Sequence, residues 1–350
     1  MLKRLTPREQ FEQLIANFEP LIRKAFEDAV ADIRSNVQLR RIVERLERND
    51  IAGAIEALNI DRAAFNPVAD AIRQAYNAGG TAAVAGMPAL RDPDGHRLVV
   101  RFDVRNLRAD RWLAEHSSTL IANITADMRE AARITLTAGM EAGRNPRSTA
   151  LDLVGRLNRA TGRREGGILG LTSIQAEYVA SMRARLLSGD PAEMRKVLSM
   201  TRRDKRFDRT ILKAIAEGYS VSTDMVARMT ARYADSLLLL RGETIARTET
   251  MPALGQSQEE AFQQAIDKGA IRAGQIEGIW HSAGDKRVRA THGDHGGMNG
   301  QKVGWKEPFV SPSGARLMFP GDTSLGAGPS EVCNCRCWRE LKINFFAGLR

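Results

Sequence analysis

Apolar residues recur at helical spacing over most of this chain, and this pattern constrains its fold more than any other feature. A first helical segment is expected over residues 8–48, where Pro20 predicts a kink or a restart of the helix. The apolar positions follow the steps of three and four that line one buried face of a helix. They are Phe11, Leu14, Ile15, Phe18, Ile22, Ala25, Phe26, Ala29, Val30 and Ile33. The N-terminal part is therefore expected to be helical.

Helical periodicity continues as far as residue 268. A helical pair expected over 51–77 ends at NAGG, a helix-stop signal. The sequence STLIANITADMREAARITLTAGMEAG predicts a helix that starts at a Ser/Thr cap and stops at glycine. Further helices are expected near 172–188, 190–200 and 221–268. Aromatic residues make up only 5% of the chain, and stretches rich in Ala, Leu, Arg and Glu also favour helices over a β-sandwich.

One early segment has the period of a strand instead. The sequence RLVVRFDV alternates strictly, with Leu98, Val100, Phe102 and Val104 on one side and mostly charged residues on the other. This pattern predicts a strand with one solvent-facing side, in a small sheet or hairpin.

Past Gly269 the helical period disappears, and Gly, Pro, Trp and His accumulate between turn signals such as SPSGA. The expected fold class is α+β, a predominantly helical N-terminal body with a small turn-rich α+β C-terminal module. The expected domains are a helical region ending in a short strand over 1–107, a helical body over 108–239 and the α+β module over 240–350.

The chain is basic, with a formal charge of +10 and a pI near 9.9, which favours a polyanionic partner such as nucleic acid. Two loops supply candidate phosphate contacts, and a solvated basic surface is the alternative. The candidates are Arg159, Arg163, Arg164, Arg202, Arg203, Lys205, Arg206 and Arg209. Few aromatic residues lie among them, so contact with duplex DNA is favoured over base stacking on single strands.

All three cysteines lie in EVCNCRCWRE, as Cys333, Cys335 and Cys337. Their odd number and clustering argue against a secreted disulfide framework. On a strand they would share one face, where thiolates bind zinc, and His292 is a candidate further ligand. His281 and His295 lie in the same part of the chain. Thiols buried in a core and redox chemistry are the alternatives to a metal site.

The same residues allow an enzymatic reading, a metal-dependent hydrolase or transferase centred on His292 and Cys335. His292, Asp294 and His295 could include a general base. However, only Asp285 and Asp294 could hold magnesium nearby, and no P-loop, G-x-S-x-G or H-E-x-x-H motif occurs. A non-enzymatic protein is therefore expected.

No targeting or membrane segment is expected. The N-terminal sequence MLKRLTPREQFEQLI carries charges throughout and lacks the apolar core of a signal peptide. No run approaches the roughly 18 apolar residues of a membrane span. The expectation is a soluble protein made in a cytoplasm.

Four stretches, in order over about 240–340, resemble the Mu F-like minor head protein family of tailed bacteriophages. They are GETIARTETMPALGQSQEEAF, IWHSAGDKRVRATHGDHGGMNGQ, PFVSPSGARLMFPGD and NCRCW. The matching positions are Ala246, Arg247, Thr248, Glu249, Trp280, Asp285, Arg289, His292, Gly300, Phe309, Pro320, Asp322, Asn334, Cys335, Arg336 and Cys337. Among the structural motif residues, Arg247 is expected to reach a carboxylate such as Asp285 or Asp322.

The resemblance implies a minor structural protein of a phage head, present in few copies inside the procapsid near the portal. Its implied partners are the portal, the major head and scaffold proteins, and double-stranded DNA. Its implied roles are head assembly and DNA packaging or ejection. It would lie in the virion, and in the host cytoplasm during assembly.

Overall fold

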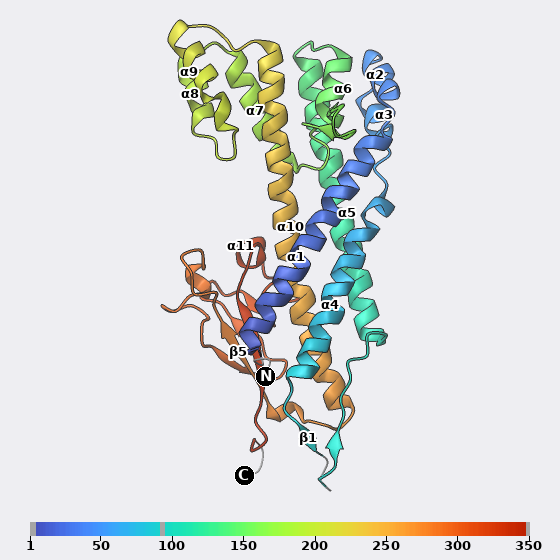
Figure 1. Cartoon of the computed structure of the whole chain (residues 1–350), viewed down its shortest axis with the longest axis vertical. Coiled ribbons are helices and arrows are strands. Elements are labelled where there is room, and N and C mark those ends of the chain that lie inside the picture. The colour runs from blue at the N-terminus through green and yellow to red at the C-terminus, as the bar shows by residue number, and fades with distance from the viewer. Residues whose placement is uncertain (1–4, 92–94, 348–350) are drawn as a thin grey trace. The chain divides into compact units, whose positions relative to one another are not determined.

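The computed structural model describes residues 5–91 and 95–347, and helices dominate it (Figure 1). The α-helices are α1 (Pro7–Asn36), α2 (Leu39–Glu47), α3 (Ile51–Glu56), α4 (Asn66–Gly86), α5 (Leu107–Glu141), α6 (Pro146–Val154), α7 (Ser173–Leu187), α8 (Pro191–Leu198), α9 (Asp208–Glu217), α10 (Thr223–Asp267) and α11 (Pro329–Val332). The 3-10 helices are η1 (Arg62–Phe65), η2 (Lys205–Phe207), η3 (Ala273–Gln275) and η4 (Ala290–His292). The strands are β1 (Leu90–Arg91), β2 (Arg97–Leu98), β3 (Arg156–Leu157), β4 (Arg164–Glu165), β5 (Ile276–His281), β6 (Lys302–Gly304), β7 (Phe309–Val310), β8 (Arg316–Leu317) and β9 (Trp338–Ile343). The expected α+β class is confirmed.

The chain divides into two compact units. Unit 1 comprises the described residues up to Lys24, then Val68–Ser117, and those from Glu243 onward. Unit 2 comprises Ala25–Pro67 and Ser118–Gly242. Because α1, α5 and α10 each contribute residues to both units, neither unit is one continuous stretch of sequence. No helix among the described residues is long and apolar enough to cross a membrane.

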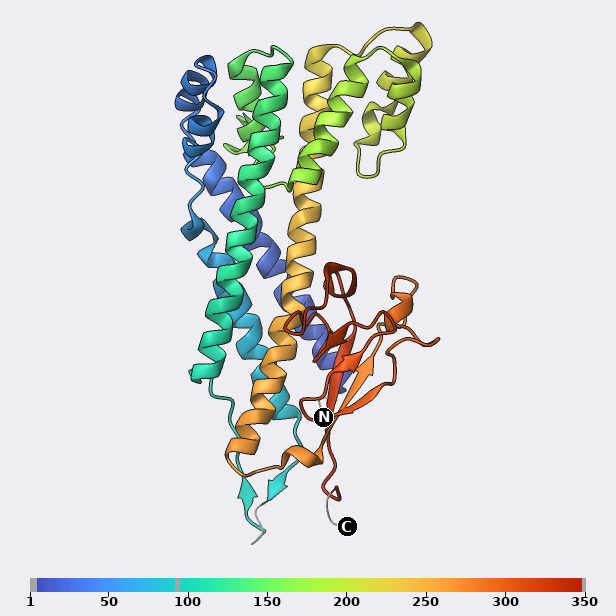
Figure 2. The ribbon, with the colours of Figure 1, turned by 180° about the vertical axis from the view of Figure 1, so that it is seen from behind.

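Unit 1 contains a small antiparallel sheet in the order β6-β5-β9, whose strands β5 and β9 lie side by side in both views of the ribbon (Figures 1 and 2). The central strand β5 is buried along most of its length, which explains its apolar sequence IEGIWH. A core cluster packs around Trp280 and continues into the cysteine-bearing segment. Its members are Trp280, Met298, Phe309, Leu317, Ala327, Val332, Cys335 and Cys337.

The helical segment expected over 8–48 forms, but its interruption lies elsewhere. Pro20 is inside α1, and the break falls instead between Asn36 and Leu39. The predicted restart at Pro20 was therefore wrong, whereas a kink at Pro20 stays a prediction.

Helix α4 does not stop at NAGG but continues through Gly79 and Gly80 to Gly86. A Cβ built on Gly79 would lie 2.4 Å from Ser257 Oγ, and one on Gly80 would lie 2.3 Å from the Phe102 ring. These glycines therefore permit close packing against α10 and the segment after β2, and they do not act as a helix-stop signal.

The strand expected over 97–104 is largely absent. Only β2 at its start has strand geometry, and β2 pairs with β1 in a two-residue hairpin. Leu98, Val100 and Phe102 are nevertheless more buried than their neighbours, as the alternation predicted, but Val104 is exposed and does not belong to that side. Helix α5 begins at Leu107, in line with the helical period that returns from Arg108 onward, but the expected Ser/Thr cap at Ser118 lies inside the helix and does not start it.

In unit 2, two buried arginines hold the glycine-rich segment after β4. Arg34 of α1 donates hydrogen bonds to the carbonyls of Gly167 (2.7 Å) and Leu169 (2.6 Å). Arg241 of α10 donates to the Gly170 carbonyl at 2.9 Å. Burial lowers the pKa of each guanidinium to about 10, and a nearby carboxylate offsets part of this effect. The loop conformation therefore depends on arginines far away in the sequence.

Candidate metal centre in the cysteine loop

The cysteine loop, residues 333–337, joins the short helix α11 to strand β9. Cys333 caps α11, and Asn334 follows with a φ of 55°, a left-handed conformation that no strand residue adopts. The strand expected over 333–337 is therefore replaced by a turn. As a result, Cys335 and Cys337 share one environment, and Cys333 does not join them.

Three of the predicted ligands converge in unit 1 and form what we call the donor cluster: His292, Cys335 and Cys337. The Nδ1 atom of His292 lies 3.6 Å from Cys335 Sγ and 3.5 Å from Cys337 Sγ. All three donor atoms lie within 4.8 Å of one another. The side chains are deeply buried, with exposed fractions of 1%, 1% and 3%.

The donor cluster fits zinc. A tetrahedral zinc with Zn–N bonds of about 2.0–2.1 Å and Zn–S bonds of about 2.3 Å places nitrogen and sulfur ligands about 3.6 Å apart. Both measured nitrogen–sulfur distances match that value. Among the described residues the cluster supplies three ligands, one imidazole and two sulfurs, of the four that zinc takes.

A buried carboxylate fixes the orientation of the His292 ring. Glu331 Oε2 lies 2.7 Å from His292 Nε2, so the Nε2–H donates a hydrogen bond to the carboxylate and Nδ1 presents its lone pair to the sulfurs. Ser313 Oγ donates to the other carboxylate oxygen at 2.8 Å. Thr291 and Ser311 lie within hydrogen-bond distance as well. This carboxylate–histidine arrangement is the usual support of a zinc-bound imidazole.

Sequence reasoning missed Glu331. A glutamate in the first turn of a helix is ordinarily exposed and stabilised by the helix dipole, so nothing in PSEV marks it as buried. Burial alone would raise the pKa of Glu331, but hydrogen bonds from Ser313 and His292 outweigh that effect and the pKa is lowered. The carboxylate is therefore in the ionised form that accepts the hydrogen bond from His292 Nε2.

The two buried thiols differ in acidity because they interact directly. A hydrogen bond from Cys337, together with the neighbouring His292, lowers the pKa of Cys335 well below its ordinary value despite burial. The interaction with Cys335 and burial raise the pKa of Cys337. Cys335 is therefore the more acidic thiol of the pair, and a bound cation would favour ionisation of both.

Residues of the Mu F-like motif hold the cysteine loop in place. Arg289 donates to the carbonyls of Ser330 and Cys333 at the end of α11. Arg336 forms a two-pronged ion pair with Asp285. That pairing lowers the pKa of the Asp285 carboxyl, and the Arg287 backbone N–H lowers it further.

The motif segment on α10 contacts the same loop. The backbone N–H of Asn334 donates to Thr248 Oγ1 at 3.3 Å. Trp280 is fully buried, and its ring packs edge-on against His292 with centroids 5.2 Å apart. The shared motif of this segment therefore packs around and orients the donor cluster.

Arg247 and Glu249 differ from the expectation. Arg247 reaches Glu19 of α1 at 3.1 Å, not Asp285 or Asp322, which are engaged elsewhere. Its partner comes from a segment 228 residues away, which the motif alone could not indicate. Glu249 lies 2.6 Å from His116 Nε2 of α5. Both residues thus join helices within unit 1.

The other residues considered for catalysis do not reach the donor cluster. Asp294 and His295 are exposed, and Asp294 pairs with the Asn299 side chain. His281 stacks on Trp338 and lies 3.0 Å from Glu340. The structure does not bring His292, Asp294 and His295 together as a general-base site.

The predicted phosphate-contacting residues lie in unit 2 and differ in their engagement. Arg203 is paired with Asp208, and Arg206 with Asp204. Arg164 donates to the Gly155 carbonyl. Exposed side chains are those of Arg159, Arg163, Arg202, Lys205, Arg206 and Arg209.

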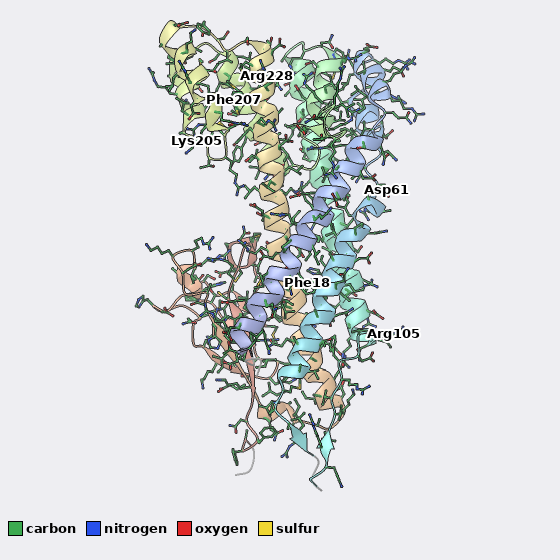
Figure 3. All side chains as sticks on the ribbon, in the orientation of Figure 1. Phe18, Asp61, Arg105, Lys205, Phe207 and Arg228 are labelled. Atoms are coloured by element: carbon green, nitrogen blue, oxygen red, sulfur yellow. The ribbon has the colours of Figure 1, made fainter. Side chains whose placement is uncertain are left out.

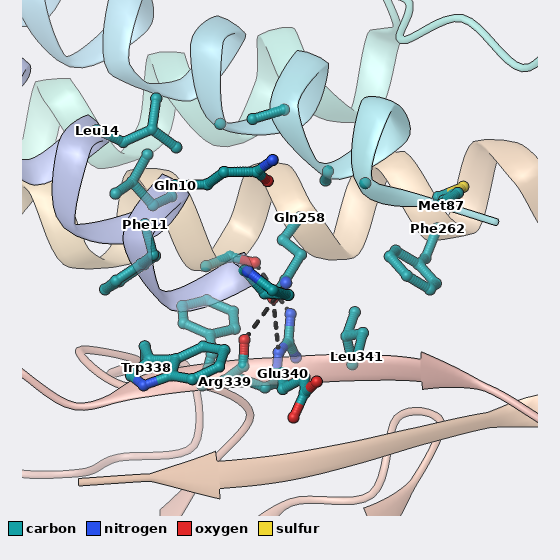
Figure 4. Close-up of a pocket in the computed structure, with 18 of the residues that line it drawn as sticks. Gln10, Phe11, Leu14, Met87, Gln258, Phe262, Trp338, Arg339, Glu340 and Leu341 are labelled. Carbon is teal, nitrogen blue, oxygen red and sulfur yellow. Dashed lines mark hydrogen bonds between the residues drawn. The ribbon is translucent and has the colours of Figure 1, made fainter. Parts of the chain in front are cut away.

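Unit 1 also has a cavity of about 380 Å³ lined mainly by apolar residues of α1, α4, α10 and β9 (Figure 4). Arg339 lies on its wall and joins β9 to α10 through hydrogen bonds to the Gly255 carbonyl (3.0 Å) and to Gln258. The guanidinium is fully engaged by the protein, since it also bonds Met318 and Glu259. Its role is therefore to attach the sheet to the helix.

Comparison with known proteins identifies one family. Residues 205–339 match the family described as Phage Mu protein F like protein. The match confirms the resemblance recognised in the sequence. It begins before residue 240 and so also includes α9 and the first part of α10. Comparisons with curated proteins and with solved structures found no significant match.

Proposed function

We propose, from the match of residues 205–339 to the Mu protein F-like family, that this protein is a structural component of a phage head and acts in head morphogenesis. The observation that carries the proposal is that the shared motif surrounds a closed, buried donor cluster. The side chains of this site are only 1–3% exposed, so Cys335 and His292 do not face solvent from which a substrate would approach. This geometry favours an architectural role over the alternative of a metal-dependent hydrolase or transferase.

In this proposal the donor cluster binds zinc as a structural ion. Bound zinc would supply a cross-link between the segment that ends at His292 and the cysteine loop. The chain's own residues prepare that site. Glu331 orients the imidazole, and Arg289 and Arg336 fix the loop that carries both thiolates. Structural zinc of this kind contributes directly to folding, because the ligands are not assembled in the unfolded chain.

The family match and the charge also support a finer role, which we include in the proposal. The protein acts inside the procapsid near the portal, and its docking partners are the portal and the major head or scaffold proteins. The formal charge of +10 suits a protein packed beside concentrated phosphate. The basic loops of unit 2 contact double-stranded DNA during packaging or ejection.

The test is assembly itself. Procapsids made with and without this protein are purified and assayed for its incorporation, for its co-purification with portal, and for infectivity. The proposal predicts that the protein sediments with procapsids and that particles lacking it are defective. Particles that assemble, package and infect normally without it would refute the structural role, and so would turnover of a substrate by the purified protein alone.

A further inference from the structure

In unit 2 the two basic loops that are separate in the sequence border one open cleft of about 510 Å³. One wall is the β3–β4 hairpin, another is the η2 turn, and α10 lies between them. Figure 3 places the labelled Phe207 of η2 near Arg228 of α10, with Lys205 on the same turn. The lining residues are Arg156, Leu157, Asn158, Glu165, Arg206, Phe207, Arg228, Ala231, Arg232 and Asp235.

Three of the four arginines in this cleft were not predicted as DNA contacts. Arg228 and Arg232 are four residues apart on α10 and therefore lie on one face of the helix. Arg156 opens the hairpin, and all three side chains are exposed. Arginines spaced along a long helix look like an ordinary solvated face. Only the fold shows that they meet the hairpin and the η2 turn.

The two carboxylates of the cleft are already engaged. Asp235 accepts the backbone N–H of Gly166 at 2.7 Å. Glu165 accepts from Asn158 Nδ2 at 2.8 Å and lies 3.9 Å from Arg232. Among the described residues, Arg156 and Arg228 form no ion pair. The cleft therefore keeps two guanidinium groups available for an external anion.

We propose that this cleft seats a backbone phosphate of duplex DNA, with Arg156 and Arg228 as its principal contacts. This inference rests on the proposed DNA contact and gives it a location. Guanidinium groups favour phosphate because their forked donors match its oxygens. The half-buried Phe207 and the exposed Leu157 give the cleft an apolar part that can pack against deoxyribose. Such contacts fix position on the duplex without reading its sequence.

The test uses the full chain and a fluorescently labelled DNA duplex of random sequence, with anisotropy measured over a series of salt concentrations. The cleft variant is Arg156→Gln with Arg228→Gln. Its matched control is Arg62→Gln with Arg195→Gln, which removes two exposed arginines of unit 2 outside the cleft and changes the net charge equally. Circular dichroism and thermal unfolding check that both variants fold.

The cleft variant is expected to bind at least about tenfold more weakly at physiological salt, with a log–log salt slope shallower by about 0.9, the value for one lost phosphate contact. The control should change neither quantity by a comparable amount. If the unmodified chain binds duplex but the cleft variant behaves like the control, the location is wrong and DNA contact lies elsewhere. If the unmodified chain does not bind duplex at all, the proposed DNA contact fails as well. If polyglutamate displaces the labelled duplex as effectively as unlabelled duplex does, the inference is overturned in favour of an acidic protein partner.

Discussion

His292 is the residue on which the candidate metal centre depends, because its two ring nitrogens have different partners. Nε2 donates to Glu331, and Nδ1 faces the sulfurs of Cys335 and Cys337. A second buried acid beside Nδ1 would compete with a metal for the imidazole. Instead, two soft sulfurs lie about 3.5 Å from Nδ1, and together these atoms present a site for a soft cation. The three cysteines are therefore not equivalent, although the sequence presents them at regular spacing.

This non-equivalence predicts different effects of serine substitution. Cys335→Ser and Cys337→Ser should each abolish tight zinc binding, measured as zinc content after purification and dialysis. Cys333→Ser is the matched control and should keep its zinc, because Cys333 lies outside the donor cluster. Loss of an ion present at a hundred times its Kd removes about 2.7 kcal/mol of stability. Equal loss of zinc in all three variants would contradict the assignment.

Glu331 should matter to metal affinity without being a ligand. Glu331→Gln keeps the size of the side chain but removes the charge that orients and polarises His292, and it should weaken zinc binding by about 10- to 100-fold. Glu340→Gln is the control, since Glu340 pairs in the same way with His281 at 3.0 Å, away from the donor cluster. Competition with a chromophoric chelator measures both affinities. Unchanged affinity in Glu331→Gln would show that the carboxylate has no such role.

At the scale of elements, α4 shows how packing can override a local signal. Its NAGG segment has the composition of a helix end, but Gly79 and Gly80 instead allow other side chains to approach the helix backbone. The favourable contacts with Ser257, Leu254 and Phe102 outweigh the low helix propensity of two glycines. Helix length here is decided by tertiary contacts.

This account predicts opposite outcomes for two Gly→Ala substitutions in the same helix. Gly79→Ala should destabilise unit 1 by about 1–3 kcal/mol, because its Cβ would displace the buried Ser257 hydroxyl and press on Leu254. Gly86→Ala should be neutral or slightly stabilising, since the nearest atom to its Cβ is 3.9 Å away. Denaturant unfolding of both variants gives the comparison. A Gly79→Ala variant as stable as the parent would disprove the close-packing explanation.

At the scale of the whole molecule, the chain divides into two compact units, and the donor cluster belongs to unit 1. Two buried arginines bonded to backbone carbonyls hold the glycine-rich segment of unit 2, whereas unit 1 contains a sheet and the cysteine loop. Removal of a metal from the donor cluster should therefore loosen the structure of unit 1 and leave that of unit 2 unchanged.

Hydrogen exchange followed by mass spectrometry tests that locality. Chelation of zinc should increase exchange over residues 276–343, where the sheet and the cysteine loop lie, and leave residues 118–242 of unit 2 unchanged. The Cys335→Ser variant should show the same pattern without chelator. A uniform increase across both units would show that the ion stabilises the molecule as one cooperative body.

Periodicity and local motifs predicted the helical body, the α+β class, the helix near 172–188, and the segment that matches the Mu F-like family. These features depend on residues close together in the sequence, whose side-chain spacing and capping chemistry act over a few residues. The sequence also indicated three of the four side chains around the candidate metal centre, because thiols and imidazoles are rare and were concentrated in one segment.

Only the tertiary structure decided which of those groups meet. The left-handed turn at Asn334 separates Cys333 from Cys335, Glu331 becomes buried behind His292, and Arg247 finds Glu19 across the length of the chain. The cleft that joins Arg156 to Arg228 likewise has no counterpart in the sequence. Spacing along the chain determines which face of an element a residue occupies, but contacts between distant segments determine what that face meets.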